Sequence, residues 1–258
     1  MSNKITLIGV FCLGLSFISC HVKNPNEYHY PKNLSISNAK GLPKYPTTFY
    51  FPDTISQDTN LVKTEIPTFK LNWFSSALYS AKEPILYNYY LGHDIYRFLW
   101  LRSFHRPVVF TFHRDGNKIW LTTKKLNKQP EFYDLGEIEF IPPKFLPNGK
   151  PDTTQVRYKE KPLRKIIRKA DRKADIILNE TKKLSEKDWT EFETLLINYS
   201  FWTSKPYIEE FGLDGSEWTI EGHLKDKYWV VNRWSPNDNL RKIGEYLIKK
   251  SGLNEKTR

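Results

Sequence analysis

The chain has 258 residues, with 40 Lys and Arg against 29 Asp and Glu, which gives a formal net charge of +11. Apolar residues make up 39% of it, including 8 Trp, 16 Phe and 15 Tyr, which is enough for the core of one large or two small domains and excludes a disordered chain. The presence of only 12 Gly and 2 Cys excludes a glycine-repeat fibre and a disulfide scaffold.

The first 19 residues have the pattern of a secretory signal peptide. Lys4 precedes an apolar run from Ile5 to Ile18, and the small residue Ser19 follows that run. The run is about 14 residues long, whereas a membrane-spanning helix needs about 20. A short uncleaved anchor is the alternative, and it fits this length less well. We therefore expect residues 1–19 to be removed.

The end of this segment, Phe17-Ile18-Ser19-Cys20, resembles the lipobox of bacterial lipoproteins, although Phe17 stands where Leu is usual. The resemblance implies cleavage before Cys20, acylation of its thiol and its new amino group, and loss of Cys12 with the signal. Several acyl chains on one cysteine make a lasting membrane anchor. No acidic run follows Cys20, which favours the periplasmic face of the outer membrane over surface display.

Residues 20–47 are expected to be a flexible tether that carries the lipidated cysteine. They contain many Asn, Ser and Lys, no apolar periodicity, and the four prolines Pro25, Pro31, Pro43 and Pro46. The composition changes at Thr48. We expect residues 48–258 to form a single domain.

The first half of this domain is rich in residues that favour strands. Apolar residues recur at helical spacing between Pro67 and Pro84 and predict a helix there. Asp115-Gly116 is expected to join two strands in a hairpin with type I′ turn chemistry. Strands are predicted over residues 48–51, 85–91, 95–104, 107–113, 118–124 and 133–140.

The second half alternates helices with strands. A basic helix is predicted to start at Pro162, a strand to cover residues 174–179, and a second helix to start at a capping box formed by Ser185 and Asp188. A last helix is predicted over residues 239–250, with Gly252 placed to end it.

Between these last two helices, residues 217–221 and 227–234 predict a hairpin. Its first strand alternates, so Trp218 and Ile220 are expected to point inward and Glu217, Thr219 and Glu221 outward. Strands that follow one another in hairpins, with helices between the runs, indicate an α+β fold. We expect a mainly antiparallel sheet with about three packed helices.

Four segments together resemble a set of uncharacterised bacterial proteins. They are YRFLWLRSFHRPV at 96–108, FW at 201–202, GLDGSEWTIEG at 212–222 and YWVVNRWSP at 228–236. The resemblance covers most of residues 90–253 and implies a shared domain, but it carries no activity.

The largest charge feature is residues 157–173, where nine Lys or Arg face two acids. We expect this segment to contact an anionic surface, such as lipid headgroups or an acidic envelope polymer. The alternative is a solvated helix face. Nucleic acid is not an expected partner of an exported protein, despite the charge. The residues expected to make this contact are Arg164, Lys165, Arg168, Lys169 and Arg172.

A second basic cluster is the better candidate for a binding site. Arginine beside aromatic rings binds carboxylate, phosphate or a sugar acid through forked hydrogen bonds and stacking. The alternative is a buried arginine paired with a core acid such as Glu217 or Glu221. The cluster consists of Arg97, Trp100, Arg102, His105 and Arg106.

No strong catalytic signature is present. Glu217 and Glu221 would lie about 13 Å apart along a strand, too far for a glycosidase pair. The histidines lack metal-ligand spacing, and no phosphate or dinucleotide loop occurs, so neither a metal nor a cofactor is expected.

Three functions follow from these patterns. The first is a non-catalytic, lipid-anchored envelope protein that binds a protein partner or an anionic envelope polymer. The second is an envelope hydrolase that uses Glu221 and His223, with Arg233 as an electrostatic stabiliser. The third is an immunity-type lipoprotein that captures a secreted toxin.

Overall fold

The computed structural model describes residues 30–130 and 174–255, except residues 58, 59, 211 and 213, together with the short strands at 138–139 and 159–160. Several predictions fall outside these residues. They are the signal peptide, the lipidation of Cys20, most of the strand at 133–140, and the basic helix with Arg164, Lys165, Arg168, Lys169 and Arg172.

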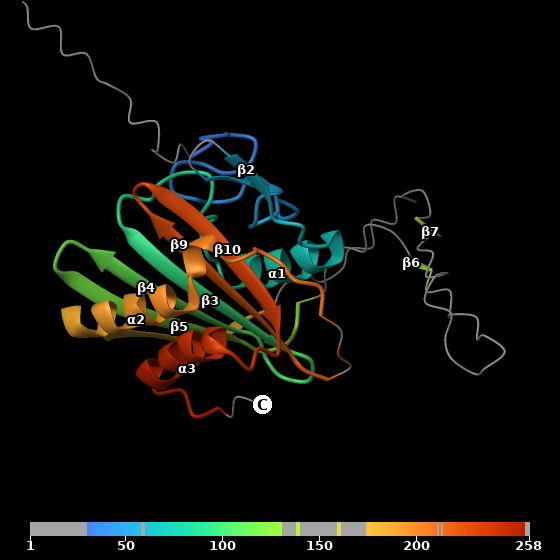
Figure 1. Ribbon diagram of the computed structural model, residues 1–258. Helices are drawn as coiled ribbons and strands as arrows, with labels where there is room; N and C mark the ends of the chain where they lie inside the picture. The colour runs from blue at the N-terminus through green and yellow to red at the C-terminus, as the bar shows by residue number, and fades with distance from the viewer. Residues whose placement is uncertain are drawn as a thin grey trace, which may run out of the picture.

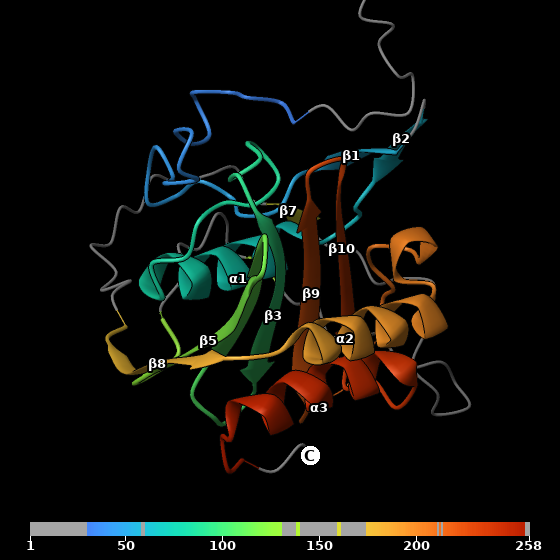
Figure 2. The same cartoon turned by 90° about the vertical axis from the view of Figure 1, so that its left-hand side faces the viewer.

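The domain is built around a six-stranded antiparallel sheet in the order β10-β9-β3-β4-β5-β8 (Figures 1 and 2). This confirms the prediction of an α+β fold with a mainly antiparallel sheet. The strands of this sheet are β3 (Asp94–Arg102), β4 (Val108–Asp115), β5 (Lys118–Leu126), β8 (Ile176–Lys183), β9 (Ser216–Leu224) and β10 (Lys227–Trp234).

The remaining elements are three helices and two small antiparallel strand pairs. None of the described helices is long and apolar enough to cross a bilayer. The helices are α1 (Thr68–Ser80), α2 (Glu186–Tyr199) and α3 (Asn239–Ser251), with a 3₁₀ turn at Phe201–Thr203; the pairs are β1 (Thr54–Gln57) with β2 (Asn60–Lys63), and β6 (Ile138–Glu139) with β7 (Lys159–Glu160).

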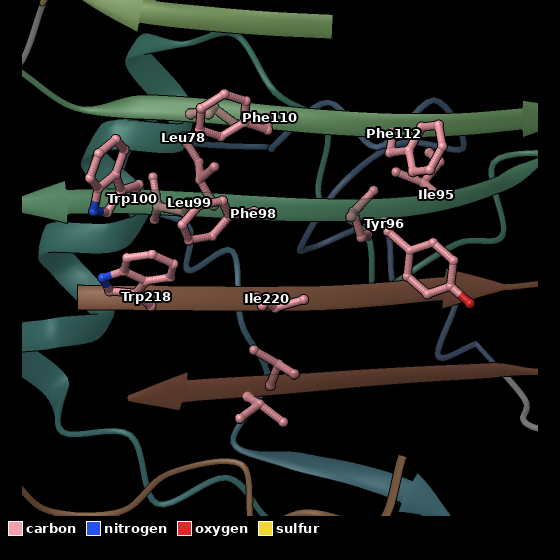
Figure 3. Packing of buried hydrophobic residues seen from close by; sticks show 14 of the residues in the cluster. Leu78, Ile95, Tyr96, Phe98, Leu99, Trp100, Phe110, Phe112, Trp218 and Ile220 are labelled. Atoms are coloured by element: carbon pink, nitrogen blue, oxygen red, sulfur yellow. The ribbon is translucent and has the colours of Figure 1, made fainter. Parts of the chain in front are cut away.

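The two faces of the large sheet differ in composition. Helices α2 and α3 cover one face, which is almost wholly aromatic and aliphatic. On that face Phe98 stacks on Phe110 with ring centroids 5.5 Å apart, and Trp218 lies 5.0 Å from Phe98 and 5.8 Å from Trp100 (Figure 3). Contacts of this kind supply much of the burial energy of a core. We call this the aromatic face.

Helix α1 and the loops around it pack on the opposite face. Leu99 and Val109 point to this side together with ionisable residues such as Arg97, Glu217 and Glu221, all of them buried. We call this the charged face. The expectation that Glu217, Thr219 and Glu221 point outward is therefore wrong, because α1 and its neighbouring loops cover the side of β9 that the sequence pattern assigns to solvent.

The helix boundaries largely follow the sequence signals. Ser185 and Asp188 form the predicted capping box at the start of α2. Gly252 ends α3 in the left-handed conformation, with a φ of 78°. Such caps satisfy backbone groups that the helix itself leaves unpaired.

Three local predictions differ from the structure. Residues 48–51 and 85–91 are not strands; they are loop segments packed against α1 and β9. The turn between β4 and β5 consists of Gly116 and Asn117, and only Gly116 has a positive φ. That pattern belongs to a type II′ turn rather than the expected type I′ turn.

Residues 30–47, expected to be part of the flexible tether, are packed on the domain. The Tyr30 hydroxyl donates to the Leu224 carbonyl at 2.6 Å, and the Lys32 amide donates to the Asn88 carbonyl at 2.8 Å. Tyr30 itself is only 6% exposed. The folded body therefore begins by Tyr30 rather than at Thr48, and the rest of the expected tether, residues 20–29, lies outside the described residues.

Candidate functional site

A cavity of about 880 Å³ opens at the end of the large sheet where β3 ends and β9 begins. Its wall comes from four places in the chain: the loop after β3, strand β5, the residues that flank the β9–β10 hairpin, and the segment after α3. The lining residues are Arg102, Ser103, Phe104, His105, Arg106, Lys125, Asp214, Gly215, Ser235 and Glu255.

Arg102 and Lys125 are placed by strand register. Trp100 pairs with Val108 and Val108 pairs with Lys125, so the side chains of Lys125, Trp100 and Arg102 share the aromatic face near its end. The Arg102 guanidinium lies 3.8 Å from the ring centroid of Trp100, which is fully buried beneath it. This stacking holds the guanidinium at the end of the aromatic face, beside the cavity.

Two close backbone contacts shape the wall opposite Arg102. The Ser103 amide donates to the Gly215 carbonyl at 3.0 Å, which ties the loop after β3 to the start of β9. A Cβ atom on Gly215 would lie 2.7 Å from ring carbons of Trp234 and would also collide with Ser235 Oγ. Glycine is therefore required at position 215 for the start of β9 to approach the end of β10.

The side chain of Gln129 holds the loop after β3 in place. Its side-chain amide donates to the carbonyl oxygens of Arg102, at 3.1 Å, and of His105, at 2.9 Å. Its own oxygen accepts from the Trp73 indole at 3.1 Å. These bonds fix the backbone from which His105 and Arg106 extend into solvent.

The carboxylate of Glu255 bridges the buried Arg102 and the partly buried Lys125. One oxygen contacts Arg102 Nη2, and the other lies 2.5 Å from Lys125 Nζ. Burial alone raises the pKa of Glu255, but the hydrogen bonds from Lys125 and Arg102 outweigh burial and hold that pKa below its usual range. The carboxylate is therefore ionised at neutral pH, and Arg102 with Lys125 forms a clamp for one carboxylate. We call this pair the carboxylate clamp.

The structure brings together three of the five predicted binding residues. Arg102, His105 and Arg106 line the cavity. Trp100 is buried beneath Arg102 and supports it rather than facing the cavity. Arg97 lies on the opposite face of the sheet, so its inclusion in this site is wrong.

Arg97 instead forms the buried ion pair that was the alternative for this cluster. Its Nε donates to Glu221 at 2.6 Å, its Nη2 lies 2.5 Å from the same oxygen, and its Nη1 donates to the Pro84 carbonyl at 2.6 Å. Tyr228 donates to the other oxygen of Glu221 at 2.9 Å. Burial raises the pKa of Glu221, and the Arg97 guanidinium and the Tyr228 hydroxyl oppose that shift. No described cavity reaches this pair.

The residues of the hydrolase alternative do not converge. Glu221 and His223 share the charged face, but Arg233 pairs with Trp218 and so lies on the aromatic face. His223 Nδ1 donates to the Leu86 carbonyl at 2.6 Å, and its Nε2 accepts from the Leu91 amide at 3.1 Å. Burial lowers the pKa of His223 to about 3, which keeps its ring neutral. Both ring nitrogens are engaged, so no acid–base role is open to it.

One pair of histidines, 20 residues apart in the sequence, comes together. His93 Nε2 lies 3.0 Å from His113 Nδ1, and His113 stacks on Trp120 with centroids 4.6 Å apart. Within the described ranges no group of three metal-ligating side chains forms around them or elsewhere.

Sequence reasoning missed Lys125, Ser103, Asp214, Ser235 and Glu255 as parts of the site. Lys125 has a signal, because it extends the alternation of the predicted strand by one residue. Asp214 and Ser235 carry only turn signals. Glu255 belongs to a segment after the last helix with no pattern at all, and only the fold brings it to Arg102.

The fold and the cavity together define an α+β domain with a basic, carboxylate-holding pocket at one end of an antiparallel sheet. Comparison of the chain with protein-family models, with curated proteins and with solved structures gives no match.

Proposed function

We propose that this chain is a lipid-anchored protein of the bacterial cell envelope whose domain binds an anionic ligand without changing it chemically. The anchor is supported by the apolar run and the lipobox-like segment that ends at Cys20. The binding role is supported by the cavity at the end of the sheet.

The carboxylate clamp is the observation that carries the binding role. Arg102 is 6% exposed at its side chain, and its Nε has no hydrogen-bond partner among the described residues. A buried guanidinium needs an anion, because desolvation of an unpaired charge costs several kcal/mol. Arginine also prefers planar carboxylates that accept two bonds. The ligand we propose is accordingly a carboxylate, such as a sugar acid of an envelope polymer.

Exposed basic residues beside the carboxylate clamp favour a ligand that carries more than one carboxylate. His105 and Arg106 lie on the rim of the same cavity and are solvent-exposed. Asp214 is an opposing charge on the far wall. A ligand with several spaced anionic groups would contact the clamp and the rim together.

The lining favours binding over catalysis. Ser103 Oγ donates to the Gly215 carbonyl at 3.1 Å and is thereby occupied. A nucleophile needs a base within hydrogen-bond reach, and among the described lining residues no hydrogen bond joins Ser103 or Ser235 to His105. The lining therefore positions charge without an activated nucleophile.

Calorimetric titration tests the binding role directly. The mature chain, residues 20–258, is titrated with an oligogalacturonate, which carries one carboxylate per sugar, and with a neutral oligosaccharide of equal length. Binding is expected for the first only. Arg102→Met keeps the contact with Trp100 and should weaken binding at least about tenfold, since a charge-assisted bond is worth about 1.5–3 kcal/mol. Arg106→Gln, on the exposed rim, should weaken it less.

Arg241→Met is the matched control, because Arg241 is an arginine on α3 that does not line the cavity. Equal affinity of the wild type, Arg102→Met and Arg241→Met for the acidic sugar would contradict the binding role.

The anchor is tested by metabolic labelling with a fatty-acid analogue. Wild-type chain should carry label and Cys20→Ala should not. Equal labelling of both would remove the lipoprotein hypothesis and leave the binding role to its own test.

A further inference from the structure

The packed segment at residues 30–47 joins the domain at the end opposite the cavity. Tyr30 contacts Leu224 and Lys227, which flank the β9–β10 turn. The cavity is lined by Gly215 and Ser235, which flank the other end of the same hairpin. In Figures 1 and 2 the amino-terminal segment, in blue, and helix α3 with the residues that follow it, in red, accordingly lie at opposite ends of the sheet.

This segment is held rigidly to the body. The Asn88 side chain donates to the Asn33 carbonyl at 2.9 Å and to Ser37 Oγ at 2.7 Å, and Asn88 itself is fully buried. The Ile85 amide donates to the Gly41 carbonyl at 2.8 Å. A surface formed by this segment is therefore oriented together with the whole domain.

The exposed side chains of the segment are both apolar and basic. Leu34 is 69% exposed, Leu42 54% and Tyr45 57%. Lys32, Lys40 and Lys44 are exposed between them, and no Asp or Glu occurs from residue 28 to residue 52. We call these six residues the amino-terminal face. Its mixture of aliphatic, tyrosine and lysine side chains is typical of surfaces that rest in the headgroup region of a bilayer.

The spacing to Cys20 limits how far this face can lie from a membrane. Tyr30 is the tenth residue after Cys20, and even a fully extended chain over these ten steps reaches at most about 36 Å. A lipid on Cys20 therefore keeps the amino-terminal face within reach of the bilayer. This step depends on the anchor in the proposed function.

We propose that the amino-terminal face docks on an anionic lipid bilayer and directs the carboxylate clamp away from the membrane. The three lysines lie in a stretch of sequence without Asp or Glu and attract anionic headgroups, and Leu34, Leu42 and Tyr45 enter the interface. The nine residues of β3 run about 30 Å along the sheet, so the cavity opens well clear of the headgroups. A polymer in the aqueous space is then accessible to the clamp.

Depth-dependent fluorescence quenching tests the orientation. The lipidated mature chain is placed in phosphatidylglycerol vesicles with a fluorophore on Leu34→Cys or on Phe104→Cys, which is 80% exposed beside the cavity. Nitroxide lipids should quench the label at position 34 and leave the label at position 104 unquenched. Equal quenching at both positions, or none at position 34, would overturn the docking proposal while leaving the anchor intact.

Vesicle binding of the mature chain with Cys20→Ser separates docking from the anchor. Each lysine near a charged bilayer contributes about 1 kcal/mol, so reversing Lys32, Lys40 and Lys44 to Glu should lower the partition coefficient about a hundredfold or more. The matched control reverses the exposed lysines Lys183, Lys187 and Lys205, with the same change in net charge, and should change it far less.

A third variant, with Arg164, Lys165 and Arg168 reversed to Glu, addresses the basic segment. Docking through the amino-terminal face predicts that this variant retains the larger part of vesicle binding. If it alone abolishes binding, the docking proposal is wrong. Absence of fatty-acid label with retained vesicle binding would instead contradict the anchor and support the docking face.

Discussion

Two arginines on one strand show how the same pair of charges serves two purposes. Arg97 and Arg102 both belong to β3, both are nearly fully buried, and both contact a glutamate. Arg97 lies on the charged face, and Arg102 lies at the end of the aromatic face beside a cavity of about 880 Å³.

The difference lies in where each glutamate comes from. Glu221 is directly opposite Arg97 on β9, so the sheet itself holds the pair and no ligand can replace the carboxylate. Glu255 belongs to the short segment that follows α3, and it meets Arg102 in an open cavity. The sheet holds the first pair in place, whereas the second is the pair that we propose exchanges its carboxylate for that of a ligand.

The largest expected effect comes from breaking the closed pair. Glu221→Gln leaves the Arg97 charge buried without its counterion, and we expect a loss of about 3–5 kcal/mol in the free energy of unfolding. The effect is measured by urea denaturation at pH 7. Glu245→Gln, in an exposed pair with Arg241 on α3, is the control and should cost less than about 0.5 kcal/mol. Similar losses for both would show that Glu221 and Arg97 are not a structural pair.

The next effect is the pH dependence of stability on the charged face. The His223 imidazole has an ordinary pKa near 6.5 when unfolded, and burial lowers that pKa to about 3 in the folded domain. Between these values the unfolded chain binds more protons, so stability falls as the pH drops from about 6.5 towards 3. One such histidine contributes a slope of about 1.4 kcal/mol per pH unit.

Denaturation curves at several pH values measure this slope. His113, whose pKa burial and the nearby His93 also lower to about 3, adds to it. His223→Gln should reduce the slope whatever its effect on stability at pH 7. An unchanged slope in that variant would contradict the assignment of a neutral, buried His223.

The aromatic face was predictable from sequence because its signals are local. Trp218 and Ile220 alternate along one strand, and the capping box at Ser185 marks the start of α2, one of the two helices that cover this face. The charged face was not predictable from sequence, because alternation shows which residues share a side of the sheet but not what covers that side. Arg97 and Glu221 become partners through strand pairing across 124 residues of sequence.

The candidate site follows the same rule. Arg102, His105 and Arg106 lie close in sequence and were predicted as a cluster. Glu255 lies 153 residues from Arg102, and no pattern marks it. Local basic clusters can be recognised in a sequence, but the acid that reveals their preference comes from the fold.

A smaller effect on stability should follow from adding a methyl group to Gly215 in the wall of the cavity. Gly215→Ala places a Cβ atom 2.7 Å from ring carbons of Trp234, which must then shift with the β10 end. We expect a loss of about 1–3 kcal/mol in stability and weaker binding of the acidic sugar. Gly92→Ala is the control for binding, because its φ of 89° adds strain, whereas its Cβ would meet no atom within 4 Å and Gly92 does not line the cavity. Equal binding by wild type and Gly215→Ala would show that this wall does not contact the ligand.

The smallest expected change in stability comes from opening the clamp. Glu255→Gln removes the carboxylate that Arg102 and Lys125 hold, and because Lys125 is 24% exposed, water and salt ions can compensate in part. Arg102 then keeps a buried charge without its counterion, but the open cavity admits water to it, so we expect a loss of about 1–2 kcal/mol in the free energy of unfolding, less than for Glu221→Gln. Affinity for the acidic sugar should rise severalfold, because the competing carboxylate is gone. Weaker binding in this variant would mean that Glu255 supports the ligand instead of standing in its place, and the two arginine pairs would then both be structural.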